Sequence, residues 1–205
     1  MTNLIKKSII VCLILTLATV ANAQNINIPD ALFKDRLINY HSPIIDTNGD
    51  GEISVSEAQA FTGTLQISNW AISDLTGIEY FTNITGLNCE SNKLTTLNIS
   101  NNTLLQYLNC FNNQNLTNLD VSNNTALTYL ECSVTSLTSI DVSNNIALED
   151  LRCGSPLTSL DVSNNTALRI LVVSKCQLTN LDVSKNINLE LLGIVDKSDA
   201  KSGYN

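Results

Sequence analysis

The sequence contains few aromatic residues, few charges and almost no histidine. Of its 205 residues, 5% are aromatic, 15% are charged and one, His41, is a histidine. No HExxH, GxSxG, GxxxxGK or GxGxxG motif occurs, so the usual signatures of metalloproteases, serine hydrolases and nucleotide-binding enzymes are absent. Lysine and arginine never form more than a pair, and the formal net charge is −8. Nucleic acid and anionic membrane surfaces are therefore not expected partners, and we predict no catalytic residues.

The one long apolar segment lies at the N-terminus. Residues 1–23 begin with the positive Lys6 and Lys7, continue through the apolar stretch Ser8–Val20 and end in Ala-Asn-Ala. This order is typical of a secretory signal peptide cleaved after Ala23, and the apolar stretch is too short for a membrane anchor. We predict a protein that is secreted or held at the cell surface, with no transmembrane segment after cleavage.

Five cysteines follow residue 23, and their spacing reveals a repeat. The steps between them are 21, 22, 21 and 23 residues, along Cys89, Cys110, Cys132, Cys153 and Cys176. Such regularity indicates a repeated unit more than a disulfide framework. Val173 and Ile194 occupy the same column in later units, so the position accepts plain apolar residues. We predict buried free thiols, with disulfides between neighbouring units as the alternative.

The repeating unit reads L-x-x-L-x-C-x-x-N-x-L-x-x-L-D-V-S-x-N, which is the pattern of a leucine-rich repeat. Leu-x-Cys predicts a short strand, and the leucine and valine of L-D-V return to the same interior. One unit cannot bury its apolar face alone, so neighbouring units share a continuous core. We predict an α/β repeat fold: a leucine-rich repeat solenoid with a parallel concave sheet over residues 64–195, a small helical cap over residues 24–63 and a tail over residues 196–205.

The repeated polar residues have structural interpretations. Asn92 and Asn113 are expected to point inward and to bind backbone groups of the loops. The serines and asparagines after L-D-V are interpreted as turn residues. The aspartates of that motif form a column, for which Asx-turn capping is expected more than a cation site: Asp120, Asp141, Asp161 and Asp182.

Residues 46–57 carry the one motif with metal chemistry. They read DTNGDGEISVSE and match an EF-hand loop at its main ligand positions, between two predicted short helices. Calcium requires several oxygen ligands on a sharp turn. The candidate ligands are Asp46, Asn48, Asp50, Glu52 through its carbonyl group, and Glu57. We expect a structural calcium ion here, and the alternative is a loop that is purely structural.

Two phrases of the sequence resemble a known family. ISDLTGIEYFTNITGLN over residues 72–88 and the downstream LDVSNNTAL are similar to the repeats of bacterial internalin-like proteins. The resemblance extends from Ile28 to about Ile194. It implies a curved solenoid with an EF-hand-like helical cap at the N-terminal end, used by many relatives to recognise proteins or surfaces. It implies no particular ligand.

The strand positions that face away from the core form the candidate binding surface, because side chains alternate along a strand. Tyr107, Phe111 and Tyr129 predict an exposed aromatic cluster, and Glu131 and Arg152 flank it. Aromatic residues with a charged rim are typical of binding hot spots and of sugar-stacking platforms. We predict a non-catalytic module that binds a protein or a surface glycan through its concave face. The alternative is a fragment of a larger surface protein, or of a repeat-scaffold enzyme, whose active or anchoring region is absent.

Overall fold

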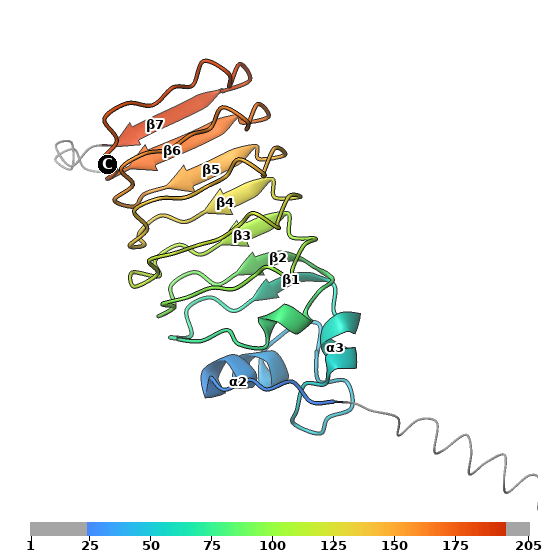
Figure 1. The fold of residues 1–205 in the computed structure, drawn as a ribbon. Coiled ribbons are helices and arrows are strands. Elements are labelled where there is room, and N and C mark those ends of the chain that lie inside the picture. The colour runs from blue at the N-terminus through green and yellow to red at the C-terminus, as the bar shows by residue number, and fades with distance from the viewer. Residues whose placement is uncertain (1–23, 196–205) are drawn as a thin grey trace, which may run out of the picture.

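The protein is built from stacked coils that each contribute one strand to a single parallel sheet. The structure, a computed structural model, describes residues 24–195, so the predicted signal peptide and tail lie outside the described residues. The seven strands follow one another in sequence order across the sheet (Figure 1). They are β1 (Gly63–Gln66), β2 (Ile84–Asn88), β3 (Tyr107–Asn109), β4 (Tyr129–Glu131), β5 (Asp150–Cys153), β6 (Ile170–Ser174) and β7 (Leu191–Val195). The predicted leucine-rich repeat solenoid with a parallel sheet is confirmed.

Helices gather at the β1 end of the solenoid (Figure 1). The first two are α2 (Ala31–Asn39) and α3 (Val55–Ala60), and a 3-10 helix, η1 (Ile78–Tyr80), lies in the first coil. Phe33 and Leu37 of α2 are fully buried. They place an apolar stripe of the helix in the core that the repeats continue, as expected for an amphipathic helix.

Asp30 fixes the start of α2 and ties it to the repeats. One carboxylate oxygen accepts the backbone N–H groups of Leu32 and Phe33 at 2.9 and 3.0 Å, which is N-capping. The other oxygen accepts the backbone N–H and the hydroxyl of Ser73, at 2.8 and 2.9 Å. Burial opposes the ionised form, but these hydrogen bonds outweigh it and lower the pKa of Asp30. A single carboxylate thus joins the cap to the first coil.

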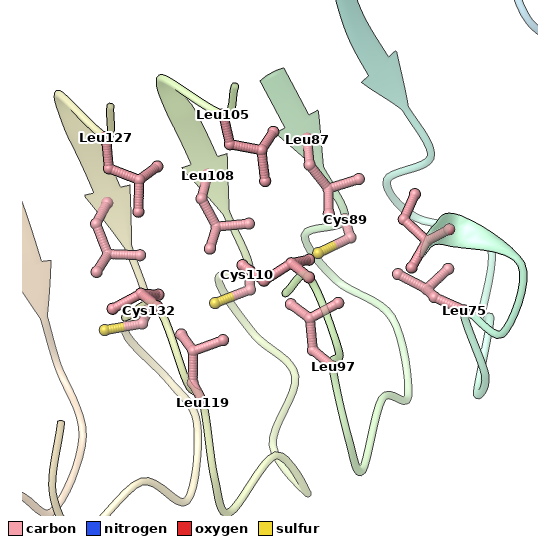
Figure 2. Close-up of a cluster of buried hydrophobic side chains, with 14 of the residues drawn as sticks. Leu75, Leu87, Cys89, Leu97, Leu105, Leu108, Cys110, Leu119, Leu127 and Cys132 are labelled. Atoms are coloured by element: carbon pink, nitrogen blue, oxygen red, sulfur yellow. The ribbon is translucent and has the colours of Figure 1, made fainter. Parts of the chain in front are cut away.

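The core consists of ladders of equivalent side chains. The register places Leu87 beside Leu108, and each later strand repeats this pairing. Figure 2 shows Leu87, Leu108 and the neighbouring cysteines pointing into one interior. Leu97 and Leu119 enter the same interior from the returning segments, which are the stretches of chain that lead from the end of one strand back to the start of the next. The predicted ladders are confirmed except at the last coil. There Leu192 and Ile194 are 42% and 58% exposed, since no described coil packs on β7.

The cysteine column consists of buried free thiols in the structure. Cys89, Cys110, Cys132 and Cys153 of this column are buried, and Val173 continues it. Cys176 lies outside the column, is half-buried and donates its thiol to the carbonyl oxygen of Cys153 at 3.1 Å. The Sγ atoms of Cys132 and Cys153 are 3.5 Å apart, well beyond the length of a disulfide bond. Burial raises the pKa of the Cys89 thiol to about 12 and raises that of Cys110 as well. The predicted thiols therefore act as small apolar residues in this structure.

The predicted inward asparagines hold neighbouring coils together. Asn92 donates through Nδ2 to the carbonyl oxygens of Ile67 and Cys89, at 2.7 and 3.0 Å. Asn113 repeats this arrangement one coil later. Hydroxyl groups of Thr135 and Ser155 take over the column and both donate to the Cys132 carbonyl. The column satisfies loop carbonyl groups that the core would otherwise bury unpaired.

A second asparagine ladder, on the returning segments, was not predicted. Its members are fully or almost fully buried: Asn102, Asn124, Asn145, Asn165 and Asn186. Asn124, for example, donates to the carbonyl oxygens of Ile99 and Asn102 at 3.1 and 2.8 Å. Each of these asparagines closes a turn through its backbone N–H, as its interpretation as a turn residue requires, but the burial of its amide inside the solenoid was not foreseen.

The aspartate column behaves as predicted. Asp120 accepts the backbone N–H of Ser122 at 2.9 Å, and the other three aspartates repeat this Asx turn. Hydrogen bonding by Ser122 lowers the pKa of Asp120. Each carboxylate is thus engaged by its own turn.

Candidate binding surface on the concave face

Two tyrosines stack at the centre of the concave face, which is the face of the sheet directed away from the core. The register places Tyr107 of β3 beside Tyr129 of β4. Their ring centroids are 4.7 Å apart and their planes differ by 11°. Neighbouring strands are about 4.8 Å apart, so equivalent side chains on successive coils stack naturally. Both tyrosines are half-buried.

Arg152 approaches Tyr129 from the next strand, β5. Its guanidinium carbon lies 5.8 Å from the Tyr129 ring centroid, within cation–π range. Two of its nitrogens, Nε and Nη2, donate to the Asp150 carboxylate at 2.9 Å each. The salt bridge with Asp150 raises the pKa of Arg152 further above its ordinary value. Tyr129 is therefore held between Tyr107 on one neighbouring strand and Arg152 on the other.

The environment of Tyr129 keeps its hydroxyl group protonated at neutral pH. Burial, followed by the charge of Glu131, raises the pKa of Tyr129 to about 12. Because the phenol is neutral, its O–H group can both donate and accept hydrogen bonds.

The structure brings together four of the five predicted binding residues, because Glu131 of β4 lies beside Arg152 of β5 in the register, and it separates Phe111 from them. Phe111 lies beyond the end of β3, is 36% exposed and forms no ring contact within the described residues. Glu131 accepts the backbone N–H of Ser133 at 2.8 Å and so is partly engaged in a turn. Sequence reasoning did not assign Asp150 to the site. The spacing of Asp150 and Arg152, two residues apart on a strand, places both on one face and could have indicated their pairing.

The concave face changes character along the solenoid. Near its start, Asn109 donates to the Glu90 carboxylate at 2.6 Å, so this part is polar and acidic. Near its end, Ile170 and Val172 are half-buried and Leu191 is 49% exposed. The tyrosine pair and Arg152 lie between the acidic and the aliphatic parts.

The predicted calcium loop in the cap is bent by hydrogen bonds between its own side chains and backbone. Asp46 Oδ2 accepts the backbone N–H of Gly51 at 3.0 Å. Asn48 Oδ1 accepts the backbone N–H of Asp50 at 2.8 Å. These bonds bend the chain sharply and direct several side-chain oxygens towards the loop.

The acidic residue at the end of this loop, Glu57, forms hydrogen bonds with other residues of the loop. The Glu57 carboxylate accepts five hydrogen bonds, at 2.8 to 3.2 Å. The donors are the backbone N–H groups of Thr47, Asn48 and Ser54 and the hydroxyl groups of Thr47 and Ser54. Burial opposes its ionisation, but hydrogen bonds from Ser54 and Thr47 outweigh burial and lower the pKa of Glu57. The Glu52 side chain pairs with Lys34 at 2.5 Å.

The three carboxylates predicted to bind calcium, those of Asp46, Asp50 and Glu57, are not gathered around one point in this structure. Among residues 24–195, no group of three or more histidine, cysteine, aspartate or glutamate side chains is placed to hold a metal ion. Glu57 would have to release Thr47 and Ser54 to reach an ion held by Asp46 and Asp50. The loop closes through its own hydrogen bonds, and calcium binding stays a prediction.

Comparison with known proteins agrees with this architecture. The family model described as the leucine-rich repeat domain of the endo-beta-N-acetylglucosaminidase EndoS matches residues 51–165, more than half of the chain. The chain belongs to this leucine-rich repeat family. A search of curated proteins gave no match.

Solved structures of this repeat class share the fold. Internalin C2 of Listeria monocytogenes is 20% identical, with a TM-score of 0.67, over 82% of this chain and 76% of that one. A leucine-rich repeat protein of Leptospira interrogans is 22% identical, with a TM-score of 0.60, over 66% and 38%. The functional domain of InlJ from Listeria monocytogenes is 28% identical, with a TM-score of 0.41, over 71% and 46%. The chain thus spans less than half the length of two of these relatives.

Within the described residues, no helix has the length and apolar character needed to cross a membrane.

Proposed function

We propose that this leucine-rich repeat protein is a secreted or surface-held recognition module that binds a partner protein through its concave face. Leucine-rich repeat solenoids are typical of protein-binding modules, because their extended sheet offers a wide curved surface. The stacked pair of Tyr107 and Tyr129, with Arg152 beside it, is the observation that supports this site. Tyrosine and arginine are the residue types most enriched in binding hot spots.

The geometry favours a protein partner over a stacked sugar. A sugar ring stacks on the open face of an aromatic side chain, but Tyr107 and Arg152 approach Tyr129 from both neighbouring strands. On Tyr129 the ring edge and the hydroxyl group remain for contact. Glu90 before the tyrosines and the aliphatic residues after them suit a partner surface with a basic part and an apolar part.

We propose no catalytic role for this face. The Asp150 carboxylate is held by both nitrogens of a bidentate salt bridge with Arg152, and Glu131 accepts a backbone hydrogen bond. Neither carboxylate has the general acid–base partner that hydrolysis requires. The glycosidase named in the family description is the enzyme that carries the related repeat domain, and its activity is not proposed for this chain.

The test uses residues 24–205 immobilised as bait for proteins of a candidate host or neighbouring cell surface. Tyr107→Ala combined with Tyr129→Ala should weaken binding of any captured partner at least tenfold without changing the melting temperature. Asn118→Ala combined with Ser139→Ala is the matched control, since both residues are exposed on the returning segments. Equal loss of binding in the control, or full binding by the tyrosine variant, would contradict the concave-face site.

A further inference from the structure

A polar groove runs along the loops that follow the strands, away from the tyrosine pair. Two adjacent cavities of about 390 and 360 Å³ share Gln114 in their lining. The first reaches back to Asn69 after β1, and the second reaches forward to Lys175 after β6. We call this combined feature the loop groove.

The loop groove follows a turn that recurs on most coils. Asn69, Ser91, Asn112, Val134 and Lys175 all have positive φ angles, between 53° and 64°. Each of the first four donates its backbone N–H to a carbonyl oxygen of the next coil, at 2.8 to 3.0 Å. Because the same turn repeats at the strand spacing on the coils of β1 to β4, its outward side chains form a row there, and the turn recurs at Lys175 after β6.

The charge of the loop groove is opposite to that of the protein. The formal net charge of the chain is −8, yet neither cavity has an aspartate or glutamate in its lining. Lys93 and Lys175 line it and are exposed. The ion pairs of the described residues involve Lys34, Arg152 and Arg169, so the ammonium groups of the two groove lysines are not neutralised by any described carboxylate. The nearby Glu90 side chain is bound to Asn109 on the concave face.

The first cavity of the groove is lined mainly by amide groups, and the second continues with hydroxyl groups and small apolar residues up to Lys175. Asn112 Nδ2 donates to the Ser91 hydroxyl at 3.2 Å, and Gln114 Nε2 donates to Asn112 Oδ1 at 3.0 Å. These bonds hold the central amides in place. Asn69 and Asn115 also line the groove, and their side chains make no hydrogen bond to other described residues. Amides that are held in place, together with amides that can still form hydrogen bonds, are suited to bind sugar hydroxyl groups, which both donate and accept hydrogen bonds.

The distance between the lysines defines the size of the ligand. Lys93 follows β2 and Lys175 follows β6, so four strand spacings of about 4.8 Å separate them, or roughly 19 Å. A single small anion cannot contact both ammonium groups over that distance. We propose that the loop groove binds an extended anionic polysaccharide, whose carboxylate or sulfate groups lie at Lys93 and Lys175 and whose hydroxyl groups contact the amides between them.

The test measures binding of residues 24–205 to three defined glycans by calorimetry at low and moderate salt. Alginate oligosaccharides carry carboxylates, dextran sulfate carries sulfates, and dextran is the neutral control. We expect at least one anionic glycan to bind, with an affinity that falls as salt rises because ion pairs are screened, and we expect no binding of dextran. Whichever anionic glycan binds identifies the anionic group. Binding of neither, or equal binding of dextran, would overturn the proposal.

Variants locate the site. Lys93→Gln and Lys175→Gln should each raise the dissociation constant about fivefold or more. Lys185→Gln removes the same charge from an exposed lysine outside the groove and should leave binding unchanged. Tyr107→Ala with Tyr129→Ala should also leave glycan binding unchanged, which separates this site from the concave face. The proposal fails if Lys185→Gln weakens binding as much as the groove variants, or if polyglutamate binds as tightly as the glycans.

Discussion

The Nε2 atom of His41 accepts the backbone N–H of Gln66 across a distance of 3.1 Å, which joins the cap to strand β1. On the other side of the ring, Nδ1 lies 3.2 Å from the carbonyl oxygen of Pro43. Since Nε2 is an acceptor, the ring is neutral and carries its proton on Nδ1. The His41 side chain is buried and packs edge-on against Phe61 at a centroid distance of 4.9 Å. Protonation of Nε2 would place an N–H group against the N–H of Gln66.

His41 should therefore make stability depend on pH. Burial, assisted by the charge of Arg36, lowers the pKa of His41 below its usual 6.5. The unfolded chain then binds a proton at a higher pH than the folded chain, so the stabilising contribution is complete above about pH 6.5 and falls as the pH drops towards the lowered folded value. We expect the melting temperature to decrease between pH 7 and pH 5. His41→Asn should be less stable at pH 7 and should flatten this dependence. An unchanged slope in the variant would show that another group is responsible.

The two neighbouring asparagines of one turn should differ greatly in their contribution to stability. Asn145 is fully buried and donates to the carbonyl oxygens of Val121 and Asn124, at 3.0 and 2.8 Å. Asn145→Ala leaves both carbonyl groups without these donors, which should lower the free energy of unfolding by about 2–4 kcal/mol. Asn144 is exposed, and Asn144→Ala should cost less than about 0.5 kcal/mol. Urea denaturation measures both. Similar losses for the two variants would argue against the buried ladder.

Asn144 and Asn145 also show how much the sequence could predict. The period of the leucines and cysteines determines which residues face the core, since apolar side chains are inward in every coil. That logic predicted the sheet, its register and the free thiols. It could not choose between Asn144 and Asn145, because both are polar and only the backbone path decides which amide meets buried carbonyl groups. Asn92 was predicted correctly since its place in the repeat pattern is a known inward position.

The candidate sites were less predictable for a related reason. Tyr107 and Tyr129 share a column, so their stacking follows from the repeat. The pairing of Glu57 with Ser54 follows from the S-x-x-E capping-box pattern, which the EF-hand interpretation overlooked. The pairing with Thr47 does not follow from a motif, because an EF-hand pattern specifies oxygen atoms and not the hydrogen bonds that compete for them. Thr47 and Ser54 lie within reach of that carboxylate and occupy both of its oxygens. Side-chain competition of this kind depends on three-dimensional packing.

The buried thiols should be nearly inert in the folded protein. The pKa of Cys89 is raised to about 12, so its thiolate fraction at pH 8 is on the order of 10⁻⁴. We expect iodoacetamide at pH 8 to modify Cys176 first, since it is half-buried whereas Cys89, Cys110 and Cys153 are buried. Peptide mass spectrometry locates the modified residue, and the same reaction in urea should label all five cysteines after residue 23. Rapid labelling of Cys110 in the folded protein would contradict the closed core.

The cap loop offers a direct test of whether calcium or hydrogen bonding holds it closed. Glu57 clamps both ends of the loop through Thr47 and Ser54, so Glu57→Ala should lower the free energy of unfolding by about 2–4 kcal/mol, the cost of several lost charge-assisted hydrogen bonds. Glu52→Ala is the matched control, because it removes only a partly exposed ion pair with Lys34 and should cost about 1 kcal/mol or less. The predicted calcium ion would add to these hydrogen bonds, so we expect EDTA to lower the melting temperature of the wild type, calcium to restore it, and Asp46→Ala to abolish the effect. An unchanged melting temperature in EDTA would contradict the calcium site and leave hydrogen bonding alone to close the loop.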